Sequence, residues 1–230
     1  MLSSSIIFSP PHPMTTYHFI RHGESEANEI RAHLICGRSS ETPLTQKGIH
    51  QARLLGHWCT NQQLQFDHVF PSKAVRAMQT AQYLCEAMHI ALENVIPLDD
   101  MEEKDQGDWT GVLRSSIYTP GKLKEMNDSD GHFAPPGGES DRQAAGRMYK
   151  AFIQHIVPAT QGAKHVAIVS HGNVIRSLVK YHLNYPVSWA DGLKNTAVTS
   201  IIKAPETEDF RVLIYNQTDH YAGEDTFSLC

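Results

Sequence analysis

Short apolar runs alternate with longer amphipathic stretches along the chain. The short runs predict strands over residues 16–20, 67–71, 94–98, 165–170, 197–202 and 210–215. Apolar residues at helical spacing predict helices over 25–34, 46–58, 73–89, 140–156 and 173–183. Strands that alternate with helices indicate an α/β fold whose largely parallel sheet is covered on both faces. We expect the last two strands to form a hairpin.

The pattern weakens between Gly111 and Gly138. Gly, Pro, Ser and Asp are frequent there, and the stretches 112–117 and 123–126 are its only short helical candidates. A connection of this length inside a compact domain is usually a functional lid or an excursion from the fold. We therefore interpret residues 112–138 as a cap inserted into one domain that spans residues 15–230.

The chain has 230 residues, a length that suits one α/β domain. Residues 9–13 read Ser-Pro-Pro-His-Pro and cannot pair inside a sheet, so residues 1–14 are predicted to form a flexible N-terminal tail. This segment lacks a basic n-region and a small-residue cleavage site, and it is not predicted to be a signal peptide. No apolar run approaches the roughly 18 residues that a membrane-spanning helix needs.

Charge and cysteine content exclude several function classes. Twenty Lys and Arg residues against 25 Asp and Glu residues give a net charge of −5. The chain therefore lacks the overall positive charge that favours a nucleic-acid or membrane partner. The four cysteines lie far apart without a C-x-x-C pair, which favours a reducing compartment, and we expect a cytoplasmic protein. The oligomeric state is left open.

Candidate chemistry gathers after two predicted strands. The first strand leads into Arg21-His22-Gly23-Glu24, and the strand 165–170 leads into His171-Gly172-Asn173. In an open α/β sheet, ligands bind beyond the carboxyl ends of the strands, where helix N-termini attract anions. Each strand thus delivers one histidine to that edge, followed by a glycine that lets backbone approach a ligand. Because the chain has 14 histidines, an ordinary surface position is an equal alternative for His171 taken alone.

Six sequence blocks occur in the order found in a known family. The blocks are Arg21-His22-Gly23-Glu24-Ser25-Glu26-Ala27-Asn28; Leu44-Thr45-Gln46-Lys47-Gly48 with Gln51-Ala52; Arg76-Ala77-Met78-Gln79-Thr80-Ala81; Glu103 with Gly107-Asp108-Trp109-Thr110-Gly111; Pro136-Gly137-Gly138-Glu139-Ser140; and Val169-Ser170-His171-Gly172-Asn173-Val174-Ile175-Arg176. With them, the chain resembles the histidine phosphatase superfamily, in its phosphoglycerate mutase-like branch, over roughly residues 15–202. The resemblance implies a three-layer α/β/α sandwich with a mostly parallel central sheet.

The resemblance implies a phosphoryl-transfer site, and the residue types suit that chemistry. His22 would attack phosphorus through a neutral ring nitrogen and form a phosphohistidine. Arg21 and Arg76 would clamp the phosphoryl oxygens with planar, permanently charged guanidinium groups. His171 would donate to the phosphoryl group in the transition state, and Glu103 would protonate the leaving oxygen and then activate water. The residues expected to line the substrate pocket are Asn28, Gly23, Gly37 and Gly172.

Two positions depart from the family pattern. Glu102 precedes Glu103, so the acid could be displaced by one residue, and we place it at Glu103 because that residue stands four positions before Gly107. Pro71-Ser72-Lys73 replaces the usual Ser-Ser-Asp-like run. Taken singly, Arg76 on an alanine-rich helix and Glu103 in an acidic stretch would more often be solvent-facing charges.

Other charged residues are given no function. The arginines interpreted as possible helix-surface charges, without a role in the site, are Arg142, Arg147 and Arg176. Arg114, Lys122 and Lys124 of the cap could select a second anionic group on the substrate, but solvated charges are the favoured interpretation.

The absence of other motifs narrows the mechanism. The sequence has no H-E-x-x-H, no H-x-H, no clustered set of ligands, no G-x-x-x-x-G-K-[ST] loop and no G-x-G-x-x-G fingerprint, so we expect no metal and no organic cofactor. The expected substrate is a small phosphorylated metabolite.

The type of reaction has three alternatives. Mutases of this family resemble one another in a longer cap with adjacent arginines. Here 36 positions separate Glu103 from Glu139, and no Arg-Arg pair occurs in 112–138. This favours a phosphatase over a cofactor-dependent phosphoglycerate mutase. A phosphate-binding module without turnover is the third alternative, disfavoured because the residues for catalysis are all present.

Overall fold

The fold is given by a computed structural model that describes residues 14–188, 192–203 and 209–222. Most of the predicted tail, residues 1–13, and Cys230 lie outside the described residues. No helix in the described ranges has the length and apolar character needed to cross a membrane.

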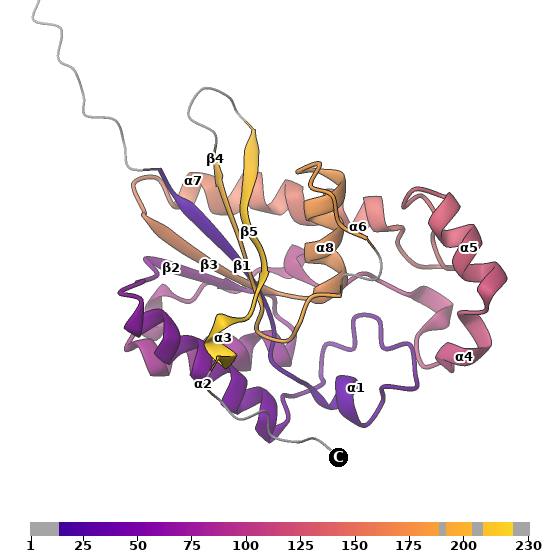
Figure 1. Cartoon of the computed structure of the whole chain (residues 1–230), viewed down its shortest axis with the longest axis horizontal. Coiled ribbons are helices and arrows are strands. Elements are labelled where there is room, and N and C mark those ends of the chain that lie inside the picture. The colour runs from indigo at the N-terminus through magenta and orange to yellow at the C-terminus, as the bar shows by residue number, and fades with distance from the viewer. Residues whose placement is uncertain (1–13, 189–191, 204–208, 223–230) are drawn as a thin grey trace, which may run out of the picture.

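A five-stranded sheet forms the centre of the molecule (Figure 1). Its strands are β1 (Thr16–Arg21), β2 (His68–Pro71), β3 (His165–Ser170), β4 (Val198–Lys203) and β5 (Phe210–Gln217). They lie in the order β2-β3-β1-β4-β5. The first three are parallel to one another, whereas β4 pairs antiparallel with both β1 and β5. The α/β class is confirmed. The sheet is mixed because its last two strands form the predicted hairpin.

Helices cover both faces of the sheet, as expected for three layers. On one face lie α2 (Gln46–Asn61) and α3 (Val75–Met88), whose apolar side chains pack with Ile20 of β1 and Val169 of β3. On the other lie α6 (Asp141–Ala151) and α8 (Gly172–Tyr181), which pack with Phe19 and Ile168. Neighbouring strand residues thus serve opposite cores, because side chains alternate along a strand. After α6 the chain continues through a π-helical turn, Phe152–Ile156, into α7 (Val157–Ala159).

Two predicted elements are shorter than the pattern suggested. The expected strand 94–98 is wrong: a 3₁₀ turn at Leu92–Asn94 is followed by isolated bridges from Val95 and Leu98 to the β2 segment. The N–H groups of Ile96 and Leu98 donate to carbonyls of β2, both at 2.9 Å, so Pro97 between them stands at an edge position where its missing N–H costs no pairing. The expected helix 25–34 is reduced to α1 (Glu26–Glu29). Its continuation buries little, with Ile30 64% exposed, and a short helix without burial is marginal.

The cap is a helical lobe at one end of the molecule (Figure 1). It contains α4 (Arg114–Ile117) and α5 (Pro120–Asp128), so both short helical candidates are confirmed. Thr119 caps α5 by accepting a hydrogen bond from the Lys122 N–H, and Pro120 occupies its first position. The lobe packs on Trp109, whose ring lies 6.2 Å from that of Tyr118 and 5.5 Å from that of Phe133. Further 3₁₀ turns are Asp99–Met101, Gly107–Trp109 and Asp219–Tyr221.

Candidate active site

The two candidate histidines follow the ends of adjacent strands. Arg21 of β1 pairs with Ser170 of β3, and the next N–H, that of His22, donates to the Ser170 carbonyl at 2.9 Å. This register brings the rings of His22 and His171 together, with centroids 5.1 Å apart. Both side chains are buried, with exposed fractions of 4% and 0%. The structure therefore joins the two motifs that the sequence places about 150 residues apart at one edge of the sheet.

Hydrogen bonds at His22 favour one tautomer of its neutral ring. Nδ1 lies 2.7 Å from the carbonyl oxygen of Gly23, which can only accept, so Nδ1 carries the proton. Nε2 then has the lone pair, and it accepts from Nε of Arg76 at 3.1 Å. Burial lowers the pKa of His22 well below its usual 6.5, and the charges of Arg76 and Arg21 lower it further. The result is an unprotonated Nε2 at neutral pH, which is the form that can act as a nucleophile.

His171 packs against the ring of His22 and has one unsatisfied nitrogen. Its Nε2 lies 3.0 Å from the hydroxyl of Ser72, whereas Nδ1 is buried without a hydrogen-bond partner among the described residues. Burial lowers the pKa of His171 well below 6.5, with the charge of Arg76 as the next cause. Ser72 is part of the run that departs from the family pattern, and here it positions the second histidine.

Two guanidinium groups flank the histidines. Arg76, in the first turn of α3, is 3% exposed, and its terminal nitrogens donate to the carbonyls of Ser39 and Arg38 at 2.8 and 2.9 Å. Arg21 donates to the carbonyl of Leu193, and its Nε is buried with no partner in the described part of the chain. Burial lowers the pKa of both arginines, yet a guanidinium stays protonated in proteins. Buried donors without a partner are rare and indicate a site for an acceptor.

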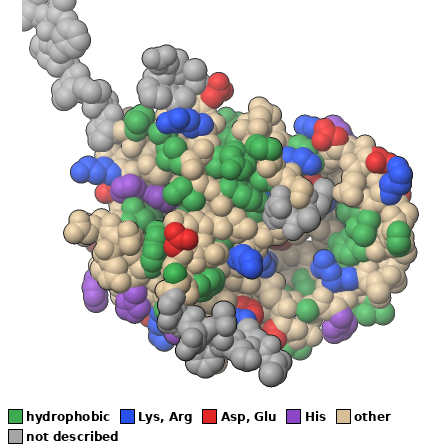
Figure 2. Space-filling view, in the orientation of Figure 1, with side chains coloured by type: hydrophobic (Ala, Val, Ile, Leu, Met, Phe, Trp, Pro, Cys, Tyr) green, Lys and Arg blue, Asp and Glu red, His purple; other side chains and the backbone are tan. Residues whose placement is uncertain are grey.

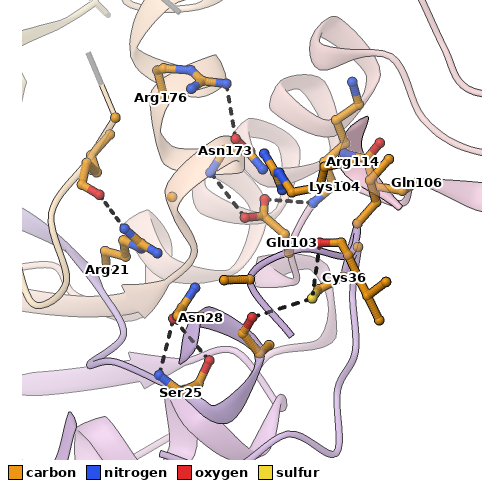
Figure 3. Close-up of a pocket in the computed structure, with 18 of the residues that line it drawn as sticks. Arg21, Ser25, Asn28, Cys36, Glu103, Lys104, Gln106, Arg114, Asn173 and Arg176 are labelled. Carbon is orange, nitrogen blue, oxygen red and sulfur yellow. Dashed lines mark hydrogen bonds between the residues drawn. The ribbon is translucent and has the colours of Figure 1, made fainter. Parts of the chain in front are cut away.

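The structure distinguishes the two neighbouring glutamates. Glu103 lines the cavity, and its carboxylate accepts hydrogen bonds from the N–H groups of Asn173, Val174 and Lys104 at 3.1, 3.0 and 2.8 Å. The first two lie in the N-terminal turn of α8, so this helix orients the carboxylate (Figure 3). Glu102 instead forms an ion pair with Arg38 at 3.4 Å and is absent from the cavity wall.

Charged residues in the wall and behind it hold the glutamate loop in place. Arg147 binds both carboxylate oxygens of Glu139, at 2.8 and 2.9 Å, and donates to the carbonyls of Glu102 and Glu103. Lys104 forms an ion pair with Asp141 at 2.9 Å, in which the two side chains are 3% and 4% exposed. The residue after Glu103 is thus anchored to the N-terminus of α6.

The site opens into a cavity of about 760 Å³ (Figures 2 and 3). Of the predicted pocket residues, Asn28, Gly37 and Gly172 line it and Gly23 does not. A Cβ on Gly23 would lie 2.5 Å from the carbonyl oxygen of Gly48, so this glycine serves the close packing of two backbone segments. Gly37 has φ of +53°, a conformation that favours glycine.

Sequence reasoning missed several residues of the wall. Arg176 was given no role, yet it is 7% exposed, lines the cavity and donates to the side chain of Asn173 at 3.1 Å. Its spacing of three from Asn173 and four from Gly172, on the helix after His171, was the signal that could have found it. Lys104 was also missed. Arg142 pairs with Asp130 outside the cavity.

No group of three or more His, Cys, Asp or Glu side chains in the described residues has an arrangement that could hold a metal ion.

A comparison with known families gives a match over most of the chain. The sequence model of the histidine phosphatase superfamily (branch 1) matches residues 17–218. The chain belongs to the histidine phosphatase superfamily. Members of this superfamily are phosphatases or mutases, which supports an enzyme.

Individual relatives include both types of enzyme. A 2,3-bisphosphoglycerate-dependent phosphoglycerate mutase from Methylorubrum populi is 34% identical over 162 residues, which are 69% of this chain and 74% of that protein. Among solved structures, a mycobacterial glucosyl-3-phosphoglycerate phosphatase has a TM-score of 0.75 at 24% identity, over 89% of this chain and 100% of that one. A phosphoglycerate mutase from Bacillus anthracis has a TM-score of 0.76 at 20% identity, over 92% and 96%. These two structures confirm the phosphoglycerate mutase-like fold.

Proposed function

We propose that the protein hydrolyses phosphomonoesters through a phosphohistidine on His22. The observation that carries the proposal is the pair of buried, unpartnered nitrogens, Arg21 Nε and His171 Nδ1, beside a neutral imidazole. An anion bound there would satisfy both nitrogens when His171 Nδ1 carries the proton. Three guanidinium groups, those of Arg21, Arg76 and Arg176, line the same cavity and favour a phosphoryl group as that anion.

In the first step, the Nε2 lone pair of His22 attacks phosphorus. The P–N bond forms while the P–O bond to the leaving group breaks, and Glu103 in its protonated form gives its proton to the leaving oxygen. The Nδ1–H of His22 donates to the Gly23 carbonyl, so the positive charge that develops on the ring meets a hydrogen-bond acceptor. Arg21, Arg76 and His171 stabilise the charge on the phosphoryl oxygens.

In the second step, the Glu103 carboxylate removes a proton from a water molecule. The water oxygen bonds to phosphorus and the P–N bond breaks, which returns the electron pair to Nε2 and releases inorganic phosphate. The Nε–H of Arg76 donates to the resting nucleophile at 3.1 Å; it loses this acceptor when Nε2 bonds to phosphorus and can then donate to a phosphoryl oxygen.

A phosphoglycerate mutase is the second candidate, because the curated relative described above has that activity. In a mutase, the phosphoryl group on His22 would pass to a second acidic substrate and not to water. The cap supplies few charges for such a substrate. Lys122 pairs with Glu125 and Lys124 with Asp128, and neither lysine lines the cavity, whereas Arg114 does. These pairings favour hydrolysis. A binding module without turnover is disfavoured because His22, Glu103 and the arginine groups converge on one cavity.

The free thiols Cys36, Cys59 and Cys85 favour a reducing compartment, and we retain the cytoplasm as the proposed location.

Phosphate release from p-nitrophenyl phosphate in EDTA tests the proposal. We expect release by the wild type and none by His22→Ala. If neither protein releases phosphate, general phosphatase activity is refuted. Conversion of 3-phosphoglycerate to 2-phosphoglycerate, faster than its hydrolysis, would favour the mutase.

A further inference from the structure

Four apolar side chains lie in the part of the cavity wall that comes from the cap and from the loop before Gly37. Leu34 and Ile35 line it from the loop, and Leu123 and Met126 line it from α5. Backbone hydrogen bonds fasten the loop to the start of the cap: Ile35 N–H donates to Val112 and Gly111 N–H to Ile35, at 2.9 and 2.8 Å. The two apolar segments are therefore parts of one connected wall.

Helix α5 directs its apolar face to the cavity. Leu123, Met126 and Asn127 line the cavity, and their spacing of three and four residues places them on one side of the helix. Its lysines, Lys122 and Lys124, are engaged by carboxylates of the same helix. Leu123 remains 43% exposed, so it leaves apolar surface open to the cavity.

The cavity is much larger than a phosphoryl group needs. At about 760 Å³ it falls within the roughly 300–1,000 Å³ of pockets that bind drug-sized ligands. Arg114 lines the cap side as well, with its guanidinium carbon 5.1 Å from the centre of the Tyr118 ring. Figure 2 shows hydrophobic side chains on the cap lobe beside the hollow.

We propose that the physiological substrate is an amphiphilic phosphomonoester. Its phosphate binds between His22 and the guanidinium groups, and its alkyl or aryl group rests on Leu123 and Met126 of α5. Water leaves these side chains when the organic group covers them, which favours binding. This inference rests on the proposed function for the phosphate end, and it adds the class of the organic part.

Alkylphosphonates of increasing length test the apolar subsite. Their P–C bond has no leaving oxygen, so calorimetric titration of the wild type measures binding without turnover. We expect affinity to rise with each methylene, by up to about fourfold where the methylene is fully buried. An affinity that stays flat from methylphosphonate to hexylphosphonate would overturn the inference.

Substitutions on the cavity side and on the solvent side of α5 test where the apolar subsite lies. Leu123→Ser and Met126→Ser should reduce the gain from hexylphosphonate, whereas methylphosphonate should bind as it does to the wild type. Lys124→Ser, on a solvated side chain of the same helix, is the matched control and should keep the full gain. Leu123→Met is a control for disruption of the cap by substitution at this position. It retains an apolar side chain, so it should retain most of the gain in affinity. Equal losses in Leu123→Ser and Lys124→Ser would contradict an apolar subsite at this position.

Turnover separates this inference from the proposed function. Hydrolysis of hexyl phosphate and glycerol phosphate at equal rates would overturn the inference and leave phosphatase activity intact. Length-dependent phosphonate binding without hydrolysis of any ester would leave the subsite intact and refute the phosphatase.

Discussion

His22 and His171 follow buried parallel strands, whereas Leu123 and Met126 stand on a nine-residue helix that has no fully buried residue. Around the histidines, hydrogen bonds specify the tautomer of His22, and the strand register fixes which residues meet. In the cap, the lysines of α5 form ion pairs with carboxylates of the same helix, and these paired side chains remain largely exposed. We call these two regions the phosphoryl end and the cap.

In the function proposed here, the two regions have different tasks: the phosphoryl end carries out the reaction, and the cap selects the organic group of the substrate. A reaction that transfers a phosphoryl group needs donors fixed before the charge develops, and a sheet edge provides such fixed positions. Selection of an organic group needs a surface that can change without disturbing those donors. The cap meets this requirement because its cavity-lining residues belong to α4, α5 and the turn between them.

Apart from loss of the nucleophile His22, the largest effect on activity is expected at Glu103, within the phosphoryl end. Glu103→Gln removes the proton donor and acceptor but retains a side chain of nearly equal size, so turnover should fall by about 10²–10⁴-fold. Glu102→Gln is the matched control, since Glu102 pairs with Arg38 outside the cavity, and its turnover should stay close to wild type. Steady-state kinetics of both variants measure the difference. A larger loss of turnover in Glu102→Gln than in Glu103→Gln would show that Glu102 is the general acid.

Lys104→Met should cause the largest loss of stability. The substitution leaves Asp141 as a buried charge without its lysine, and breaking such a pair costs about 3–5 kcal/mol of unfolding free energy. Urea denaturation of the variant measures this cost. Adding Asp141→Asn should recover part of it, because the unpaired charge is then removed. If Lys104→Met unfolds like the wild type, the ion pair does not anchor the loop that carries Glu103.

Acid should destabilise the sheet and the phosphoryl end. Burial lowers the pKa of His18 to about 3, and that of His22 and His171 also lies below 6.5. Below pH 6.5 the unfolded chain binds protons that the folded chain does not, so stability is full above pH 6.5 and falls as the pH falls toward the folded pKa.

At pH 5, His18 alone accounts for roughly 2 kcal/mol of this loss. Urea unfolding at pH 7 and pH 5 tests the effect. His18→Gln should be less stable at pH 7, because it loses the contacts of the ring with Ser200 and His165, but it should depend less on pH. The same pH dependence in both proteins would contradict a neutral, buried His18.

The smallest effect is expected on the surface of the cap. Lys124 and Asp128 form an ion pair in which the side chains are 77% and 63% exposed. Water screens such a pair, so Lys124→Ala should leave the melting temperature unchanged within error. A clear decrease would show that the cap depends on its surface charges.

The sequence predicted the phosphoryl end better than the cap. Strand ends and two His-Gly motifs were sufficient to bring His22 and His171 together, because parallel strands place their carboxyl ends on one edge. The burial of Arg176 escaped prediction, because its spacing of three and four residues from Asn173 and Gly172, which places it on the same side of the helix, was not applied. The segment expected as a strand at 94–98 pairs with the β2 segment only through isolated bridges at Val95 and Leu98, because a local pattern does not contain how far such pairing extends.

In the cap, the sequence predicted an insertion over residues 112–138 with two short helices and with solvated charges at Arg114, Lys122 and Lys124. The orientation of the helices depends on Trp109, just before the cap, and on hydrogen bonds from residues 33–35, which are distant in the sequence. The apolar face of α5 toward the cavity was therefore not foreseen.

The central claim is that His22 carries the phosphoryl group. Intact-protein mass spectrometry of Glu103→Gln, quenched during reaction with p-nitrophenyl phosphate, tests it most directly, because the variant lacks the base that activates water for the second step. We predict that one phosphoryl group accumulates on the protein, that peptide mapping places it on His22, and that Glu103→Gln combined with His22→Asn gains none. A phosphoryl group on another residue, or an equal gain in the double variant, would contradict the claim.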